Sequence, residues 1–214
     1  MSEIDPKIEK ISLMLSMQGE MNSRVDRDWL SRDREWYRAI WIECAELMDH
    51  YGDWKWWKHS EPDFEQVILE IVDIWHFGLS QRIQGDGNHR RTAADIAREW
   101  DSLRPALPFL EEVEQLAHAA LVEKRFAVDS IRKLLEACGR GFDDLYRSYI
   151  GKNVLNVFRQ DHGYKTGDYV KIWDGREDNV VLSELIAGLD SDDARFRDAV
   201  YRSLKTRYEE IGNS

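Results

Sequence analysis

Apolar residues recur along this chain at spacings of three and four far more often than they alternate with polar residues. That period is typical of amphipathic helices, and only four prolines and thirteen glycines interrupt it. The pattern therefore predicts an all-α fold built as a helical bundle. Helices are expected at about residues 6–22, 32–50, 62–84, 91–101, 108–121, 124–138, 141–158 and 192–210. Residues 84–91 are expected to be a loop, and residues 163–179 a long ordered one.

The candidate chemistry is not spread evenly along the chain. Residues 86–140 contain little beyond amphipathic helix pattern, and we expect them to form a smaller helical lobe whose role is mainly packing. Residues 1–85 and 141–214 are expected to form a rigid all-α core that carries the functional site. A chain of 214 residues with 43% apolar content is long enough to bury such a core.

The net charge of −11 narrows the possible partners. Its field repels nucleic acid and anionic lipid, so neither is expected to bind. Two cysteines, Cys44 and Cys138, form no disulfide framework or metal motif, which is typical of a reduced chain. The stretch "MSEIDPKIEK" has acids where a signal peptide would be basic and then apolar, and no apolar run is long enough to span a membrane. We expect a cytoplasmic protein.

Two pairs of acidic residues stand out on consecutive predicted helices. Glu43 and Glu46 lie one turn apart beside the apolar face of the first helix, where alone they would be an ordinary solvated pair. Glu70 and Asp73 lie on "FEQVILEIVDIWHFGLS", which is apolar round most of its circumference and is therefore expected to be buried. Buried carboxylates must be neutralised by protons, basic partners or metal.

The two acid pairs can meet across an antiparallel helix pair, where they would repel one another unless cations lay between them. Ligation by oxygen alone selects a hard cation, so the pattern predicts a metal–carboxylate centre for Mg²⁺, or Mn²⁺, between core helices. His76, one turn beyond Asp73, could instead complete half of an iron site, but no second carboxylate–histidine motif accompanies it. A core histidine and a ligand-contacting histidine remain equally compatible with its position.

A basic stripe is unexpected in so acidic a chain. In "YIGKNVLNVFRQDHGYKTGDY" a helix places Lys152, Asn156 and Arg159 on one side. Tyr164 and Lys165 follow after a glycine. Arginine and lysine suit phosphate oxygens, and asparagine suits a sugar or base edge. Salt bridges to neighbouring acids explain the stripe equally well.

Taken together, these motifs resemble those of the dimeric all-α dUTP diphosphatases, within the superfamily of all-α nucleoside triphosphate pyrophosphatases. The superfamily pattern is represented here by "ECAE" and "EIVD". The narrower resemblance rests on "ECAELMDHYGDWKWWK", "EIVDIWHF" and "YIGKNVLNVFRQDHGYKTGDYVKIWDGREDN", and it covers about residues 10–82 and 145–182. It implies a homodimer that hydrolyses dUTP to dUMP and pyrophosphate, which limits uracil entry into DNA and supplies dUMP.

The resemblance also implies roles for individual residues. The Mg²⁺ ligands, for two or more ions, would be Glu43, Glu46, Glu70 and Asp73. Glu46 would orient the attacking water, although Glu43 could do so instead. Phosphate contacts would come from Lys152, Arg159 and Lys165, and nucleoside contacts from Asn156 and Tyr164. In "LSMQGEMN", Gln18 and Asn22 match the helix that reads uracil; without the resemblance they would be assigned to a partly exposed helix surface.

The tryptophan-rich stretch and the choice of base are less constrained. Trp57 and Lys58, with His76, are candidates for the substrate pocket, but the tryptophans could equally close a dimer interface. Base choice lies in a few pocket contacts, so a related enzyme acting on dCTP or another nucleoside triphosphate is the nearest alternative, and dUDP is a possible second substrate. A non-catalytic helical dimer with solvated acids is the alternative from another class.

Overall fold

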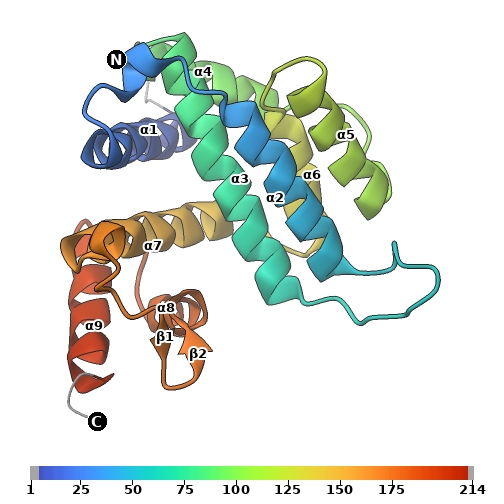
Figure 1. Ribbon diagram of the computed structural model, residues 1–214. Helices are drawn as coiled ribbons and strands as arrows, with labels where there is room; N and C mark the ends of the chain where they lie inside the picture. Colours follow the sequence, from blue (N-terminus) through green and yellow to red (C-terminus); the bar gives the residue numbers. More distant parts are fainter. Residues whose placement is uncertain (1–4, 212–214) are drawn as a thin grey trace. The chain divides into compact units, whose positions relative to one another are not determined.

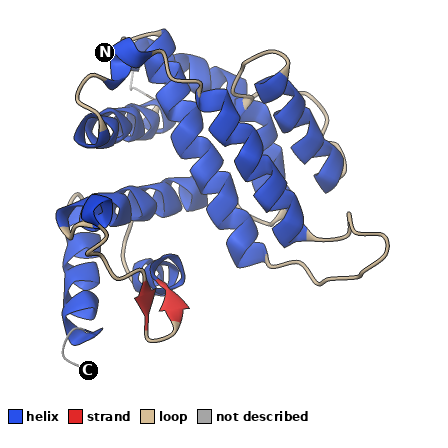
Figure 2. Cartoon of the chain, in the orientation of Figure 1, coloured by secondary structure: helices blue, strands red, loops and turns tan. Residues whose placement is uncertain are grey.

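A computed structural model describes residues 5–211 of the chain (Figure 1). The described part is mostly helical, with nine α-helices and one short hairpin, so the predicted all-α fold is confirmed (Figure 2). Contacts divide the chain into two compact units, Met1–Leu145 and Tyr146–Ser214. No helix in the described part is both long and apolar enough to cross a membrane.

The first unit contains the helices that carry the acidic residues. Its elements are α1 (Pro6–Val25), a 3-10 helix (Trp29–Arg32), α2 (Trp36–Tyr51), α3 (Phe64–Gly85), α4 (His89–Trp100), α5 (Phe109–Leu121), α6 (Val128–Ala137) and the start of α7 (Phe142–Asp161). Three of these helices begin at a side-chain cap: Asp5, Asp63 and Asn88 each accept a hydrogen bond from a backbone N–H in the first turn. The helix bounds agree with the predicted positions to within a few residues, so the predicted helices of this unit are confirmed.

Helices α2 and α3 form an antiparallel pair and lie side by side in Figure 1. At one end, Trp36 Nε1 donates to Gln84 Oε1 at 2.8 Å. At the other end, the backbone N–H of Asp63 donates to the carbonyl of His50 at 2.9 Å. Most of α3 is buried, as its apolar circumference predicts. The pair fixes how the acidic residues of one helix face those of the other.

Residues 86–140 pack directly on this helix pair. Helix α5 contacts α2, where the Phe109 and Tyr51 rings stack with centroids 3.8 Å apart. Helix α6 contacts α3, and just before α6 the Phe126 ring meets Trp75 edge-on at 5.5 Å. Contacts group residues 86–140 with 1–85, while residues 146–214 form the other unit. The predicted core of 1–85 with 141–214, and the predicted lobe of 86–140, stay predictions.

The second unit is organised around an aromatic core. Beyond α7 it contains a 3-10 turn (Tyr164–Thr166), β1 (Ile172–Trp173), β2 (Arg176–Glu177), α8 (Asp178–Ala187) and α9 (Phe196–Ile211). The two strands pair antiparallel, with Trp173 opposite Arg176. The Phe158 ring lies within 6.3 Å, centroid to centroid, of four tyrosine and tryptophan rings: Tyr169, Trp173, Tyr201 and Tyr208.

Helix α8 is the main difference from the predicted elements, because no helix was predicted over Asp178–Ala187. Its ten residues, "DNVVLSELIA", spread their apolar side chains over more than one side, so they lack the one-sided period that reveals a surface helix. The stretch 163–179 also contains the 3-10 turn and the hairpin, which makes it an ordered connection, as expected.

Candidate active site

Three of the four predicted carboxylate ligands come together in the first unit. Oxygens of Glu43 and Glu46, from α2, and of Glu70, from α3, all lie within 4.8 Å of one another. The burial of the three is graded: Glu70 is 8% exposed, Glu43 is half-buried and Glu46 is exposed. The cluster therefore extends from the α2–α3 interface to the surface, and solvent or a ligand can reach it at Glu46.

Burial, together with the crowding of negative charge, shifts the pKa values of this cluster. Burial, a hydrogen bond with Glu70 and the neighbouring carboxylates raise the pKa of Glu43 to about 8. Burial also raises the pKa of Glu70, although its hydrogen bond with Glu43 opposes the rise. The cluster without metal therefore holds a proton between Glu43 and Glu70 at neutral pH. A set of carboxylate oxygens that retains a proton to relieve its own repulsion fits a hard divalent cation.

Asp73 lies close to this cluster without joining it. It is absent from the group of oxygens within 4.8 Å of one another, which among the described residues consists of Glu43, Glu46 and Glu70. Its charge nevertheless contributes to the raised pKa values of both Glu43 and Glu70. The assignment of Asp73 as a metal ligand stays a prediction.

A chain of buried polar groups connects α1 with α3. His76 Nδ1 lies 2.7 Å from Gln18 Oε1, and because an amide oxygen only accepts, Nδ1 carries the proton. Gln18 Nε2 donates to Asn22 Oδ1 at 3.0 Å, and Asn22 Nδ2 donates to the Ser80 hydroxyl at 2.9 Å. Ser80 in turn donates to the carbonyl of His76 at 3.0 Å.

This polar chain answers one question that the sequence left open. Gln18 and Asn22 are 5% and 8% exposed, so the alternative of a partly exposed helix surface was wrong. Sequence analysis did not find Ser80. The signal that could have revealed it is its place one turn after His76 on a helix expected to be buried.

In the tryptophan-rich loop between α2 and α3, Trp54 and Lys55 contact α2, whereas Trp56 and Trp57 are exposed. Trp54 Nε1 donates to Asp49 at 3.2 Å, and Lys55 forms an ion pair with the same carboxylate. Trp56 and Trp57 are 88% and 61% exposed, and their rings meet edge-on at 5.4 Å. The predicted substrate contacts of Trp57 and Lys58 stay predictions, as does the alternative of a dimer interface.

In the second unit, the basic stripe on α7 is partly neutralised from within. Arg159 binds Asp178 through two hydrogen bonds of 2.8 and 2.7 Å and donates to Asn156 Oδ1 at 3.2 Å. Tyr169 also donates to Asp178, at 2.7 Å. The salt-bridge alternative therefore holds for Arg159, while its phosphate contact stays a prediction. Sequence analysis missed Asp178, because it is the first residue of the unpredicted helix α8.

The other predicted contacts of this unit occupy different settings. Lys152 is 4% exposed, whereas Tyr164 is 47% exposed and Lys165 is exposed. Tyr164 lies in a turn that begins at Gly163, with φ of 84°, where an added Cβ would lie 2.9 Å from Asp168 Cβ. The glycine is required for this tight turn, which presents the Tyr164 ring 5.8 Å from the Arg159 guanidinium carbon.

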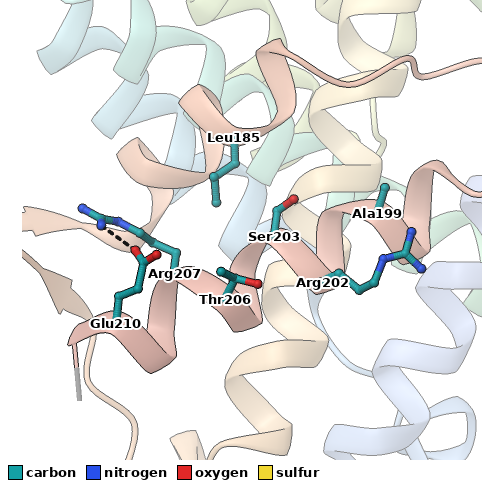
Figure 3. A pocket seen from close by; sticks show the side chains of 7 residues that line it. All are labelled: Leu185, Ala199, Arg202, Ser203, Thr206, Arg207 and Glu210. Atoms are coloured by element: carbon teal, nitrogen blue, oxygen red, sulfur yellow. Dashed lines mark hydrogen bonds and ion pairs between the residues drawn. The ribbon is translucent and has the colours of Figure 1, made fainter. Parts of the chain in front are cut away.

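A hollow of about 480 Å³ also lies on the second unit, beside α8 and α9 (Figure 3). Its two arginines, Arg202 and Arg207, point to opposite sides rather than toward a common point (Figure 3). Arg207 also pairs with Glu210 at 2.8 Å. Because its cations do not converge, this hollow does not resemble a phosphate site, and sequence analysis assigned it no role.

The helical fold and the carboxylate cluster between two antiparallel helices are compatible with the all-α nucleoside triphosphate pyrophosphatases that the sequence resembles. The family model described as dUTPase matches residues 10–164, which is more than half of the chain. The chain therefore belongs to the dUTPase family and is a dUTP diphosphatase. The match also runs through residues 86–140, which the resemblance seen in the sequence leaves out. A comparison with curated proteins gave no match.

Proposed function

We propose that this dUTPase hydrolyses dUTP to dUMP and pyrophosphate in a reaction that depends on Mg²⁺. The observation that carries the proposal is the set of three glutamates whose oxygens lie within 4.8 Å of one another. Such a set is unfavourable without a cation, as the raised pKa of Glu43 indicates. The residues proposed to hold the metal are Glu43, Glu46, Glu70 and Asp73, for two or more ions, with Mn²⁺ as a substitute.

When bound, Mg²⁺ supplies positive charge for the phosphates and lowers the pKa of a coordinated water. The glutamates hold the metal near the triphosphate and accept the proton of the attacking water. Glu46 is the exposed member of the cluster, so a water molecule can reach its carboxylate. We assign to Glu46 the acceptance of the proton from the water that attacks the α-phosphorus. The bond from that phosphorus to the α–β bridging oxygen breaks, and pyrophosphate leaves.

Recognition of uracil is assigned to the polar chain on α1 and α3. Gln18, Asn22 and His76 are already oriented by hydrogen bonds to one another and to Ser80. Amide groups both donate and accept, which suits the N3–H and carbonyl oxygens of uracil. Rigid polar groups of this kind reject a base that leaves them without partners, which supports selectivity for dUTP over dCTP.

The remaining assignments follow the family resemblance. Phosphate contacts are proposed for Lys152, Lys165 and Arg159, nucleoside contacts for Asn156 and Tyr164, and pocket contacts for Trp57 and Lys58. The exposed tryptophan rings are compatible with a ligand or a second subunit covering them. We further propose that the enzyme acts as a homodimer in the cytoplasm, where it limits uracil entry into DNA and supplies dUMP.

The test is pyrophosphate release from dUTP, dCTP and dTTP, with phosphate release from dUDP, each in Mg²⁺ and in EDTA. We expect turnover of dUTP that EDTA abolishes. Glu46→Gln should leave the fold intact and abolish turnover, because the amide cannot accept the proton. Glu114→Gln, an exposed glutamate of α5, is the matched control and should retain activity. Turnover in EDTA would refute the metal dependence, and faster hydrolysis of dCTP would refute the assigned base.

A further inference from the structure

We propose that His50 is a positioning residue that orients the Glu70 carboxylate for metal binding. The inference rests on the proposed function, because it takes Glu70 to be a metal ligand. This role requires only that the imidazole donate a hydrogen bond to the carboxylate.

The imidazole of His50 is a basic group that reaches the carboxylate cluster. His50 Nε2 lies 3.5 Å from Glu70 Oε1, which is within ion-pair distance and longer than an ordinary hydrogen bond. His50 is on the same helix as Glu43 and Glu46, and its imidazole pairs with Glu70 across the helix pair. The most buried of the three carboxylates therefore has a basic neighbour.

The antiparallel helices explain why these two side chains meet. His50 O and Asp63 N are joined at the end of the pair, so Glu70 lies seven residues farther along α3 than the level of His50. Side chains on a helix lean toward its N-terminus. His50 therefore leans along α2 toward Glu46, and Glu70 leans along α3 toward Val67, so the two side chains approach each other from opposite directions.

The end of α2 is held firmly enough to keep this geometry. The Tyr51 ring, next to His50, stacks on Phe109 with an interplanar angle of 11°. Gly52 follows with φ of 77°, and a Cβ added there would lie 2.8 Å from the Ser60 hydroxyl. Helix α5 of the predicted lobe thus supports the helix that carries two of the glutamates, and it fixes the backbone from which His50 projects.

His50 acts from outside the cluster rather than as a metal ligand. It is not part of the group of atoms within 4.8 Å of one another, which consists of three carboxylates among the described residues. A donor beside Glu70 would engage one lone pair of the carboxylate and leave the others for metal. Partners of this kind fix the orientation of a ligand, and their loss weakens metal affinity about 10- to 100-fold.

The test measures Mn²⁺ binding to the metal-free protein from the electron paramagnetic resonance signal of free Mn²⁺, without substrate. His50→Ala should weaken Mn²⁺ binding about tenfold or more. His50→Gln retains an N–H donor in a similar place, so it should restore most of the affinity. His118→Ala, on the exposed side of α5, is the matched control and should bind as the wild type does. Urea unfolding of each variant, with metal removed, should show little change in stability.

Each outcome bears on the inference in a distinct way. Wild-type affinity in His50→Ala would overturn it while leaving the metal-dependent function in place. Equal weakening in His50→Ala and His50→Gln would also overturn it, because restoration by the donor is what orientation predicts. If the wild type itself shows no saturable Mn²⁺ binding, both the inference and the proposed metal dependence are overturned. If His50→Ala fails to fold, the comparison of His50→Gln with His118→Ala decides, and a tenfold loss in His50→Gln overturns the inference.

Discussion

Raising the pH of the metal-free protein should destabilise it, and the Glu43 side chain should contribute a measurable part of the loss. In the folded chain, burial, the hydrogen bond with Glu70 and the surrounding carboxylates raise the pKa of Glu43 to about 8, from an ordinary value of 4.5. In the unfolded chain the side chain is surrounded by water and ionises near its ordinary pKa. Between those two values the folded state binds a proton that the unfolded state has lost, so stability falls as the pH rises.

The size of the effect follows from the shift. A rise from 4.5 to about 8 is 3.5 pKa units, and at about 1.4 kcal/mol per unit it sets a ceiling of about 5 kcal/mol. Glu43 is only half-buried, and water screens it, so we expect about 1–2 kcal/mol. The stabilising contribution should be fully present below about pH 4.5, lost progressively as the pH rises through about 8, and absent above it.

The assay is urea unfolding in EDTA from about pH 5 to about pH 9, compared between the wild type and Glu43→Gln. The neutral glutamine cannot ionise, so the variant should lose the part of the pH dependence that comes from Glu43. The difference between the two curves isolates this part from the general repulsion of a chain with net charge −11. Glu114→Gln, on an exposed face, should follow the wild type. Parallel curves for the wild type and Glu43→Gln would refute the reasoning.

The raised pKa of Glu43 also predicts that Mg²⁺ binding releases a proton. Metal binding requires the ionised carboxylate, so it must displace the proton that Glu43 shares with Glu70. We expect release of about one proton per protein at neutral pH, and an affinity that rises with pH up to about 8. Calorimetry in buffers of different ionisation enthalpy measures the proton count. Metal binding without proton release would contradict the assignment of Glu43 as a ligand.

Two further predictions concern stability and are checked by urea unfolding. Gly78→Ala places a Cβ 2.4 Å from the buried Phe126 ring and should lower the free energy of unfolding by about 1–3 kcal/mol. Gly85→Ala, whose added Cβ has nothing within 4 Å, should be neutral or stabilising. Equal effects of the two substitutions would contradict the packing argument. Arg104→Met leaves Glu112, which is 1% exposed, without its bidentate partner and should lower the free energy of unfolding by about 3–5 kcal/mol. The double variant Arg104→Met/Glu112→Leu should recover much of that stability. No recovery would show that the unpaired charge of Glu112 is not the cause of the loss.

The sequence predicts the helices of the first unit well because their apolar residues recur at helical spacing, on one side in most of them and round most of the circumference in α3. The sequence did not predict α8 because this helix has no such one-sided apolar pattern. The apolar residues of α8 are spread around a short helix, and its stability comes from packing against α9 and the hairpin, which no local pattern records. Because α8 was not predicted, its first residue, Asp178, was not identified as the partner of Arg159. The basic stripe could therefore be found from the sequence, but the acid that occupies Arg159 could not.

The sequence indicated which acids are candidates for the carboxylate centre, but it did not fix their geometry. Spacing shows that Glu43 and Glu46 share a helix face, and the apolar surroundings of Glu70 and Asp73 show that those acids are placed against the core. Neither observation fixes which acid faces which, because the loop of residues 52–63 between the two helices leaves their register open. The spacing makes all four acids equivalent, whereas the structure separates Asp73 from the other three.

The register of α2 on α3 accounts for that separation. The hydrogen bond from Asp63 N to His50 O aligns these two residues. Glu43 lies seven residues before His50, and Glu70 lies seven residues after Asp63, so the two glutamates stand at the same level, about two turns from the end of the pair. By the same count Asp73 stands at the level of Ile40, one turn beyond Glu43. A slip of one turn would bring Asp73 opposite Glu43 and move Glu70 toward Glu46, so the contacts that terminate α2 decide which carboxylates form the centre.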